Sequence, residues 1–118
     1  MRRITSMLCG VAVLLVLAMS SLAADLTGAW KCNDGGTYYL RQFGNELWWY
    51  GEQSPTNPAW SNIAYGTVRG NQIELKWTDV PKGHIMNHGI LKLELQPNGT
   101  IVARHKTGGF GGSNWSRK

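Results

Sequence analysis

The chain has 118 residues and a formal net charge of +5, from 12 basic and seven acidic side chains. Its length predicts a single domain. The basic residues are scattered along the chain, whereas a nucleic-acid-binding surface needs them clustered, so we expect no nucleic-acid partner. The mild basicity favours solubility or weak attraction to acidic polymers.

The first 23 residues have the order of a secretory signal peptide. Arg2 and Arg3 form a positive start, residues 8–19 are an apolar run, and small residues follow. The run is shorter than the roughly twenty apolar residues that a membrane-spanning helix needs. We predict export to the periplasm or the extracellular space, with cleavage after Ala23 or, nearly as well, after Ala24. The mature chain is then expected to have no stable membrane span.

Cleavage leaves residues 24–118 as one domain and lowers the formal net charge to +3, because two arginines are removed. It also removes Cys9, so Cys32 has no second cysteine with which to form an intrachain disulfide. We interpret Cys32 as a small buried apolar residue beside Trp30. An intermolecular disulfide and a reactive thiol are the alternatives.

Runs of strand-forming residues recur along the mature chain and are separated by turn residues. Gly44-Asn45 and Gly70-Asn71 are two-residue turns of the kind that accept the positive φ of tight hairpins. A third hairpin turns through residues 96–99, which contain Pro97 and Gly99. The predicted strands cover residues 28–31, 37–43, 46–50, 62–69, 72–79, 89–95, 100–106 and 113–117.

Three sequential hairpins between two terminal strands predict an all-β antiparallel meander. An open sheet of eight strands would leave two exposed edges, and closure into a barrel removes them. We therefore expect a closed or nearly closed eight-stranded barrel, with a two-sheet sandwich as the alternative fold. The Gly-rich run at 107–113 is followed by a strand rather than a helix, so it lacks the helix N-terminus of a phosphate-binding loop.

The second hairpin shows which side chains face the interior. Polar and apolar residues alternate along 72–79, so one face of this strand is apolar. A two-residue turn places Gly66 opposite Leu75 and Ala64 opposite Trp77. Small residues across from large ones can fill a narrow barrel, so we predict a packed interior.

The first residues of the mature chain resemble one group of known barrels. Residues 26–30 (LTGAW) and 33–37 (NDGGT) are similar to the first strand of avidins and lipocalins, in which a tryptophan two residues after a glycine closes the barrel floor. This chain has an extra residue between the tryptophan and the asparagine, and the later tryptophans of avidins have no counterpart. The resemblance implies the barrel fold, and it implies no biotin site.

A second resemblance covers nearly the whole mature chain. Residues 35–52 (GGTYYLRQFGNELWWYGE), 77–83 (WTDVPKG) and 107–115 (TGGFGGSNW) are similar to a family of small, often exported bacterial domains that have no assigned activity. The resemblance implies the fold and the compartment. It implies no reaction.

The first hairpin predicts an aromatic outer face. With Gly44-Asn45 as the turn, Arg41 lies opposite Trp48, and Tyr39 lies opposite Tyr50. The neighbouring side chains Leu40, Leu47 and Trp49 form the more apolar set, so we expect them to point inward. Tyr39, Arg41, Trp48 and Tyr50 would then form an outer stack suited to the flat apolar faces of sugar rings.

Two other interpretations of this aromatic face remain open. The aromatic side chains could serve only to stabilise cross-strand pairs, each worth about 0.2–1 kcal/mol. Alternatively, a loop could cover them, since residues 55–60 are enough to reach across this face. Trp60, at the end of that loop, is interpreted as a plug in one barrel mouth or as an additional contact residue for a ligand.

The remaining chemical groups give weaker signals. Asp79 is expected on the inner face, where it could cap the amides of Lys82-Gly83 or pair with Arg41 or Arg104. His84 and His88 are four residues apart in a predicted loop, which does not make them converge on a metal. No motif indicates a cofactor.

These observations favour an exported non-catalytic binding or interaction module. The expected ligands are polysaccharides or other cell-envelope ligands, bound by Tyr39, Arg41, Trp48, Tyr50 and Trp60. One alternative is a small envelope hydrolase that uses Asp79 with His84 or His105. The others are a protein-directed inhibitor that acts through the loop at 52–61 and a purely structural role.

Overall fold

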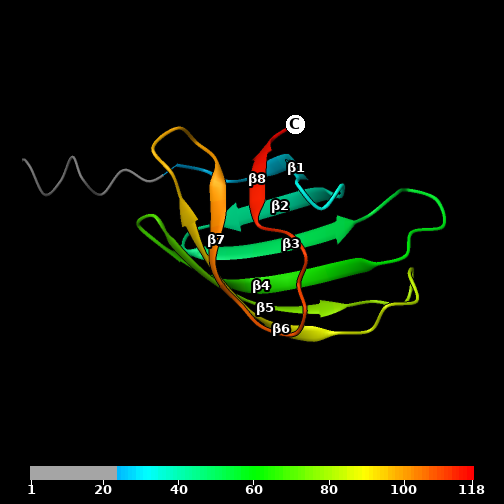
Figure 1. Ribbon diagram of the computed structural model, residues 1–118. Coiled ribbons are helices and arrows are strands. Elements are labelled where there is room, and N and C mark those ends of the chain that lie inside the picture. The colour runs from blue at the N-terminus through cyan, green and yellow to red at the C-terminus, as the bar shows by residue number, and fades with distance from the viewer. Residues whose placement is uncertain (1–23) are drawn as a thin grey trace, which may run out of the picture.

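The computed structural model describes residues 24–118, and the predicted signal peptide, residues 1–23, lies outside them (Figure 1). The described residues contain no helix. Their strands are β1 (Gly28–Cys32), β2 (Thr37–Phe43), β3 (Glu46–Glu52), β4 (Ser61–Arg69), β5 (Gln72–Asp79), β6 (His88–Leu95), β7 (Ile101–Lys106) and β8 (Asn114–Arg117). Each strand pairs antiparallel with the next, and β8 pairs with β1. The predicted eight-stranded closed barrel is confirmed.

The tight turns set the pairing of the first two hairpins as predicted. Gly44 and Gly70 have φ angles of 60° and 59°, which side-chain-bearing residues rarely adopt. The resulting registers place Arg41 opposite Trp48 and Gly66 opposite Leu75. Strand β3 runs to Glu52, two residues beyond the predicted end at Tyr50, because its last residues pair with β2 and β4 on both sides.

Aromatic side chains fill the interior of the barrel. Tyr38 is completely buried, and its ring centroid lies 5.0 Å from that of Trp49 and 5.9 Å from that of Trp115. Phe110, from the Gly-rich loop before β8, also points inside and lies 4.9 Å from Trp77. The interior is therefore packed rather than hollow, and Phe110 closes it from one end.

Strands β4 and β5 approach each other very closely at Gly66. A Cβ atom at this position would lie 1.8 Å from the carbonyl oxygen of Glu74 in the neighbouring strand. No side chain fits there, which is a common reason for a glycine inside a strand.

The barrel is closed by its last strand. Three residue pairs join β8 to β1, and only two join it to β7. Arg117 strengthens the closure, because its guanidinium donates to the carbonyl of Thr27 (2.9 Å) and lies 4.6 Å from the ring centroid of Trp30. Two segments at opposite ends of residues 24–118 are thereby joined.

Among residues 24–118, no helix is long and apolar enough to cross a membrane.

Candidate functional site

The predicted outer face is present on β2 and β3. Tyr39 is 50% exposed and Trp48 is 46% exposed, whereas Leu40, Leu47 and Trp49 are buried. The strict alternation follows from the period of two in a strand, which sends neighbouring side chains to opposite sides of the sheet. The loop between β3 and β4 leaves Trp48 exposed, so it does not cover this residue.

Strand β4 continues the face with a second aromatic residue. Tyr65 lies opposite Trp48, and the two ring centroids are 4.2 Å apart with an angle of 40° between the rings. The Tyr65 hydroxyl donates to the carboxylate of Glu46 (3.0 Å), and this hydrogen bond raises the pKa of Tyr65. The phenol therefore stays protonated, and its ring is held beside the indole.

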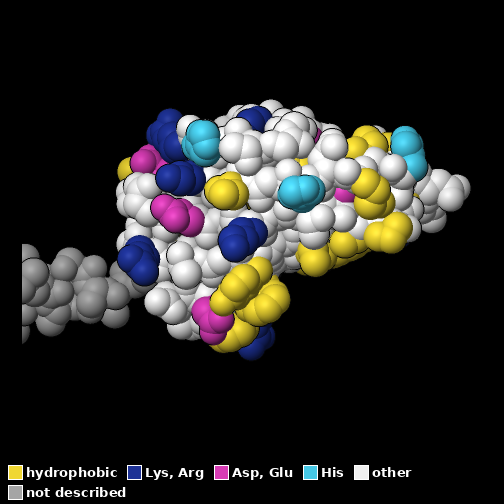
Figure 2. All heavy atoms as spheres, turned by 90° about the horizontal axis from the view of Figure 1, so that it is seen from below, with side chains coloured by type: hydrophobic (Ala, Val, Ile, Leu, Met, Phe, Trp, Pro, Cys, Tyr) yellow, Lys and Arg dark blue, Asp and Glu magenta, His cyan; other side chains and the backbone are white. Residues whose placement is uncertain are grey.

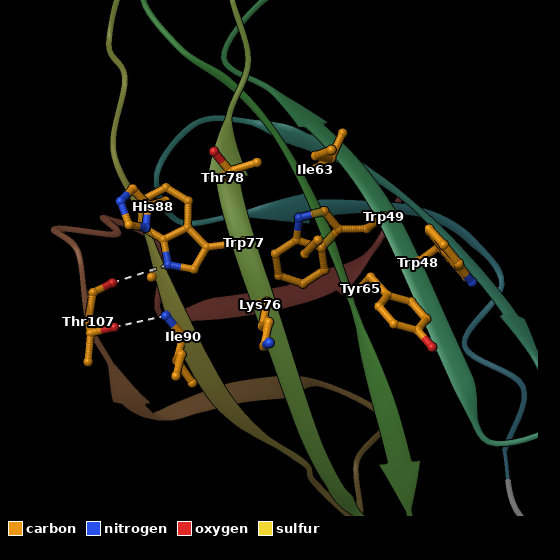
Figure 3. A pocket seen from close by; sticks show the side chains of 12 residues that line it. Trp48, Trp49, Ile63, Tyr65, Lys76, Trp77, Thr78, His88, Ile90 and Thr107 are labelled. Atoms are coloured by element: carbon orange, nitrogen blue, oxygen red, sulfur yellow. Dashed lines mark hydrogen bonds between the residues drawn. The ribbon is translucent and has the colours of Figure 1, made fainter.

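A groove of about 730 Å³ lies beside this pair and runs across strands β3 to β6 (Figure 3). We call it the outer groove. Trp48 and Tyr65 lie on one side of it, His88, Ile90 and Thr107 lie on the other, and Lys76 stands between them. The outward side chains that line it are Trp48, Ile63, Tyr65, Lys76, Thr78, His88 and Ile90.

Strand register explains why these side chains gather. Tyr65 is opposite Lys76, which is opposite Ile90, so one row of the sheet combines apolar and cationic groups. The next row places Ile63 opposite Thr78, which is opposite His88. Figure 2 shows the side on which β5 and β6 lie, with hydrophobic side chains gathered in groups and basic side chains and histidines near them.

The residues predicted for the site do not all meet. Trp48 lines the outer groove, whereas Tyr39, Arg41 and Tyr50 lie on the same outer surface beside it. The Arg41 guanidinium lies 5.8 Å from the ring centroid of Phe43. The Tyr50 hydroxyl donates to the Glu52 carboxylate (3.0 Å). The outer aromatic surface is therefore centred on Trp48 and Tyr65, which lie on two strands that belong to different hairpins.

Trp60 lies at the barrel mouth and outside the outer groove. It is partly buried, packs against the core, and has its ring centroid 5.9 Å from that of Tyr38. A Cβ atom on Gly36 would lie 2.4 Å from the Trp60 ring, so this indole closely covers the start of β2. This position favours the interpretation of Trp60 as a plug.

Sequence reasoning missed Tyr65, Ile63 and Ile90. Their outward orientation could have been found, because each alternates with residues that were expected inside the barrel. The position of Tyr65 next to Trp48 could not, because the connection from β3 to β4 is no tight turn and does not fix a register.

The predicted partners of Asp79 were wrong. Its carboxylate accepts a hydrogen bond from the backbone N–H of Asn87 (2.9 Å), and Arg104 instead donates to Glu94 (2.9 Å). The chain after Asp79 folds back, and the backbone N–H of Asp79 donates to the carbonyl of Asn87. This hydrogen bond brings the two residues together. Burial raises the pKa of the Asp79 carboxyl.

The histidines do not join a reactive cluster in the described part of the chain. Within residues 24–118, the side chains of His84 and His105 make no hydrogen bond or ion pair with Asp79. His105 lies opposite Lys92 on the barrel wall. Over the same range, no three metal-ligating side chains come together as a potential metal site.

Comparisons of the chain with protein-family models, with curated proteins and with solved structures find no match. The two family resemblances of the sequence therefore stay predictions. Function has to be inferred from the geometry of the barrel itself.

Proposed function

We propose that the protein is an exported, non-catalytic binding module whose outer groove binds a polysaccharide or another sugar-containing polymer of the cell envelope. The observation that carries this proposal is the exposed Trp48–Tyr65 pair at the side of a groove of about 730 Å³. Ligand pockets commonly have volumes of about 300–1,000 Å³.

The chemistry of the groove suits sugar rings. The faces of Trp48 and Tyr65 can pack against the apolar C–H surface of a pyranose, as aromatic rings do with other flat apolar groups. Lys76, Thr78 and His88 supply groups that can exchange hydrogen bonds with hydroxyls. A groove that is open along the sheet accommodates a section of a long chain.

Cross-strand stabilisation alone explains this surface less well. Such stabilisation accounts for Trp48 against Tyr65, because these residues are direct cross-strand neighbours. It does not account for Ile90, which is 45% exposed on the same side of the barrel and lies opposite Lys76 rather than an aromatic residue. Contiguous exposed apolar surface of this kind is typical of interaction sites.

The predicted signal peptide fits a ligand outside the cytoplasm, where envelope and extracellular polysaccharides occur. The mature chain has a formal net charge of +3, and Lys76 brings one positive charge into the groove. Acidic polysaccharides are therefore expected to bind more tightly than neutral ones at low salt.

The proposal is tested by titrating the protein with soluble acidic and neutral glycans while intrinsic tryptophan fluorescence is recorded. Trp48→Ala should weaken binding about tenfold or more, which corresponds to about 1.4 kcal/mol. Phe43→Ala is the matched control, because Phe43 is 47% exposed on the outer surface and does not line the groove. Equal binding by both variants, or no binding of any glycan by the unmodified protein, would contradict the proposal.

A further inference from the structure

A second cavity lies at the end of the barrel where β4 begins and β5 ends. Its volume is about 180 Å³, and we call it the mouth pocket. It shares only Trp77 with the outer groove. The side chains that decide its chemistry are the rings of Tyr38, Trp60, Trp77 and Phe110 and the carboxylates of Asp34 and Asp79.

The lining of the mouth pocket is acidic. Asp34 and Asp79 both contribute to it, and among residues 24–118 no lysine, arginine or histidine does so. Lys82, on the connection that follows β5, is ion-paired with Glu52 (2.5 Å). The negative charge of the pocket is therefore not balanced by a basic side chain in its wall.

The two carboxylates differ in how completely they are bonded. Asp34 uses both oxygens, since Oδ2 accepts from the Tyr38 hydroxyl (2.6 Å) and Oδ1 accepts from the Gly36 N–H (2.8 Å). Asp79 uses Oδ2 for the N–H of Asn87, while its Oδ1 accepts no hydrogen bond from residues 24–118. Asp79 is only 9% exposed, so this free oxygen belongs to a buried carboxylate that lines the pocket.

Aromatic rings surround this acidic site. Tyr38 lies 5.9 Å from Trp60, and Trp77 lies 4.9 Å from Phe110, measured between ring centroids. The faces of such rings carry partial negative charge and attract cations within about 6 Å. A carboxylate and aromatic rings in one small cavity both favour a positively charged guest.

We propose that the mouth pocket binds the ammonium group of a small organic ligand, such as a quaternary or primary amine. Asp79 Oδ1 supplies the counter-charge, and the rings of Trp60 and Trp77 contact the apolar surface of the cation. The pocket is smaller than the roughly 300–1,000 Å³ of sites for whole drug-sized molecules, so it holds one group of a larger ligand or a small amine.

The protonation of the pocket agrees with this proposal. Burial raises the pKa of Asp79 and outweighs the opposing effect of the Asn87 N–H, so the charged form has no cation beside it, among the described residues, that compensates for burial. A bound cation would supply that partner. Burial and the neighbouring Asp34 also raise the pKa of Tyr38, so its hydroxyl stays protonated and keeps Asp34 fixed in the wall.

The experiment titrates protein expressed from the full-length sequence with choline, ethanolamine and 3,3-dimethylbutan-1-ol, using calorimetry. The last compound has the shape of choline without its charge. We expect choline or ethanolamine to bind, with an affinity at least about tenfold higher than that of the neutral alcohol. Equal affinity for the alcohol, or no binding of either amine, would overturn the proposal.

Variants locate the binding. Asp79→Asn keeps an acceptor for the N–H of Asn87 and removes the charge, so amine affinity should fall at least about tenfold. Glu74→Gln makes the same charge change on the exposed side of β5 and should leave affinity unchanged. Unchanged binding by Asp79→Asn would overturn the proposal, and so would displacement of the amine by calcium at equal concentration, which would indicate a metal site.

One further variant separates this inference from the proposed function. Trp48→Ala removes the outer groove's aromatic residue and should leave amine binding intact, because Trp48 does not line the mouth pocket. Loss of amine binding in Trp48→Ala would place the amine in the outer groove and overturn the assignment to the mouth pocket.

Discussion

Trp48 and Trp49 are neighbours in β3 and have opposite environments. Trp49 is 4% exposed, donates its indole N–H to Asn62 (2.8 Å), and packs against Tyr38 inside the barrel. Trp48 is 46% exposed and packs against one aromatic ring, that of Tyr65. The comparison shows that residue type alone does not identify a binding residue, because alternation along the strand assigns one tryptophan to the core and the other to the surface.

The largest expected effect is the difference in stability between the variants Trp49→Ala and Trp48→Ala. Trp49→Ala removes a buried ring and leaves a cavity, so the free energy of unfolding should fall by about 3–5 kcal/mol. Trp48→Ala removes an exposed cross-strand contact and should cost no more than about 1 kcal/mol. Urea unfolding followed by far-UV circular dichroism measures both. Similar losses in the two variants would mean that Trp48 belongs to the stabilising core rather than to a binding surface.

A smaller loss of stability is expected at Gly66, where β4 and β5 lie too close together to admit a side chain. Gly66→Ala would place a Cβ atom 1.8 Å from the Glu74 carbonyl oxygen, so β4 and β5 must separate locally. We expect a loss of about 1–3 kcal/mol or more, as for other overpacked sites. Gly111→Ala is the control, since a Cβ there meets nothing within 4 Å, and it should change stability by less than about 0.5 kcal/mol. Equal melting temperatures for Gly66→Ala and Gly111→Ala would refute this account.

The smallest expected effect is the pH dependence of stability that the carboxyl of Asp79, on the inner face of β5, causes. Because the folded-state pKa of Asp79 is raised above 3.8, its contribution to stability is complete below that pH and is lost as the pH rises through the folded-state pKa. Asp79→Asn cannot lose stability in this way. The variant should therefore melt above the unmodified protein at pH 7, with the difference shrinking as the pH falls through the folded-state pKa of Asp79 towards 3.8. A difference that is constant with pH would exclude titration of Asp79 as its cause.

The sequence predicted those parts of the fold that depend on local geometry. Tight Gly-Asn turns fixed the register of two hairpins, so the inward positions of Leu40, Leu47 and Trp49 followed from counting. The inner pairs of β4 and β5 followed in the same way, including Gly66 opposite Leu75.

The missing parts depend on longer connections. The register of β3 against β4 places Trp48 beside Tyr65, and no tight turn sets it. The partner of Asp79 depends on how the chain between β5 and β6 folds back, which no short motif encodes. The register shift between Lys92 and Leu93, where β6 pairs with β7, likewise has no signal in the hydrophobic pattern.

The closure of β1 by β8 has a consequence for the timing of folding. Asn33 and Asn114 are joined by a hydrogen bond across 81 residues, and synthesis adds about 5–20 residues per second. Several seconds therefore pass between the emergence of β1 and that of its second partner. The barrel cannot close until its final strand is made.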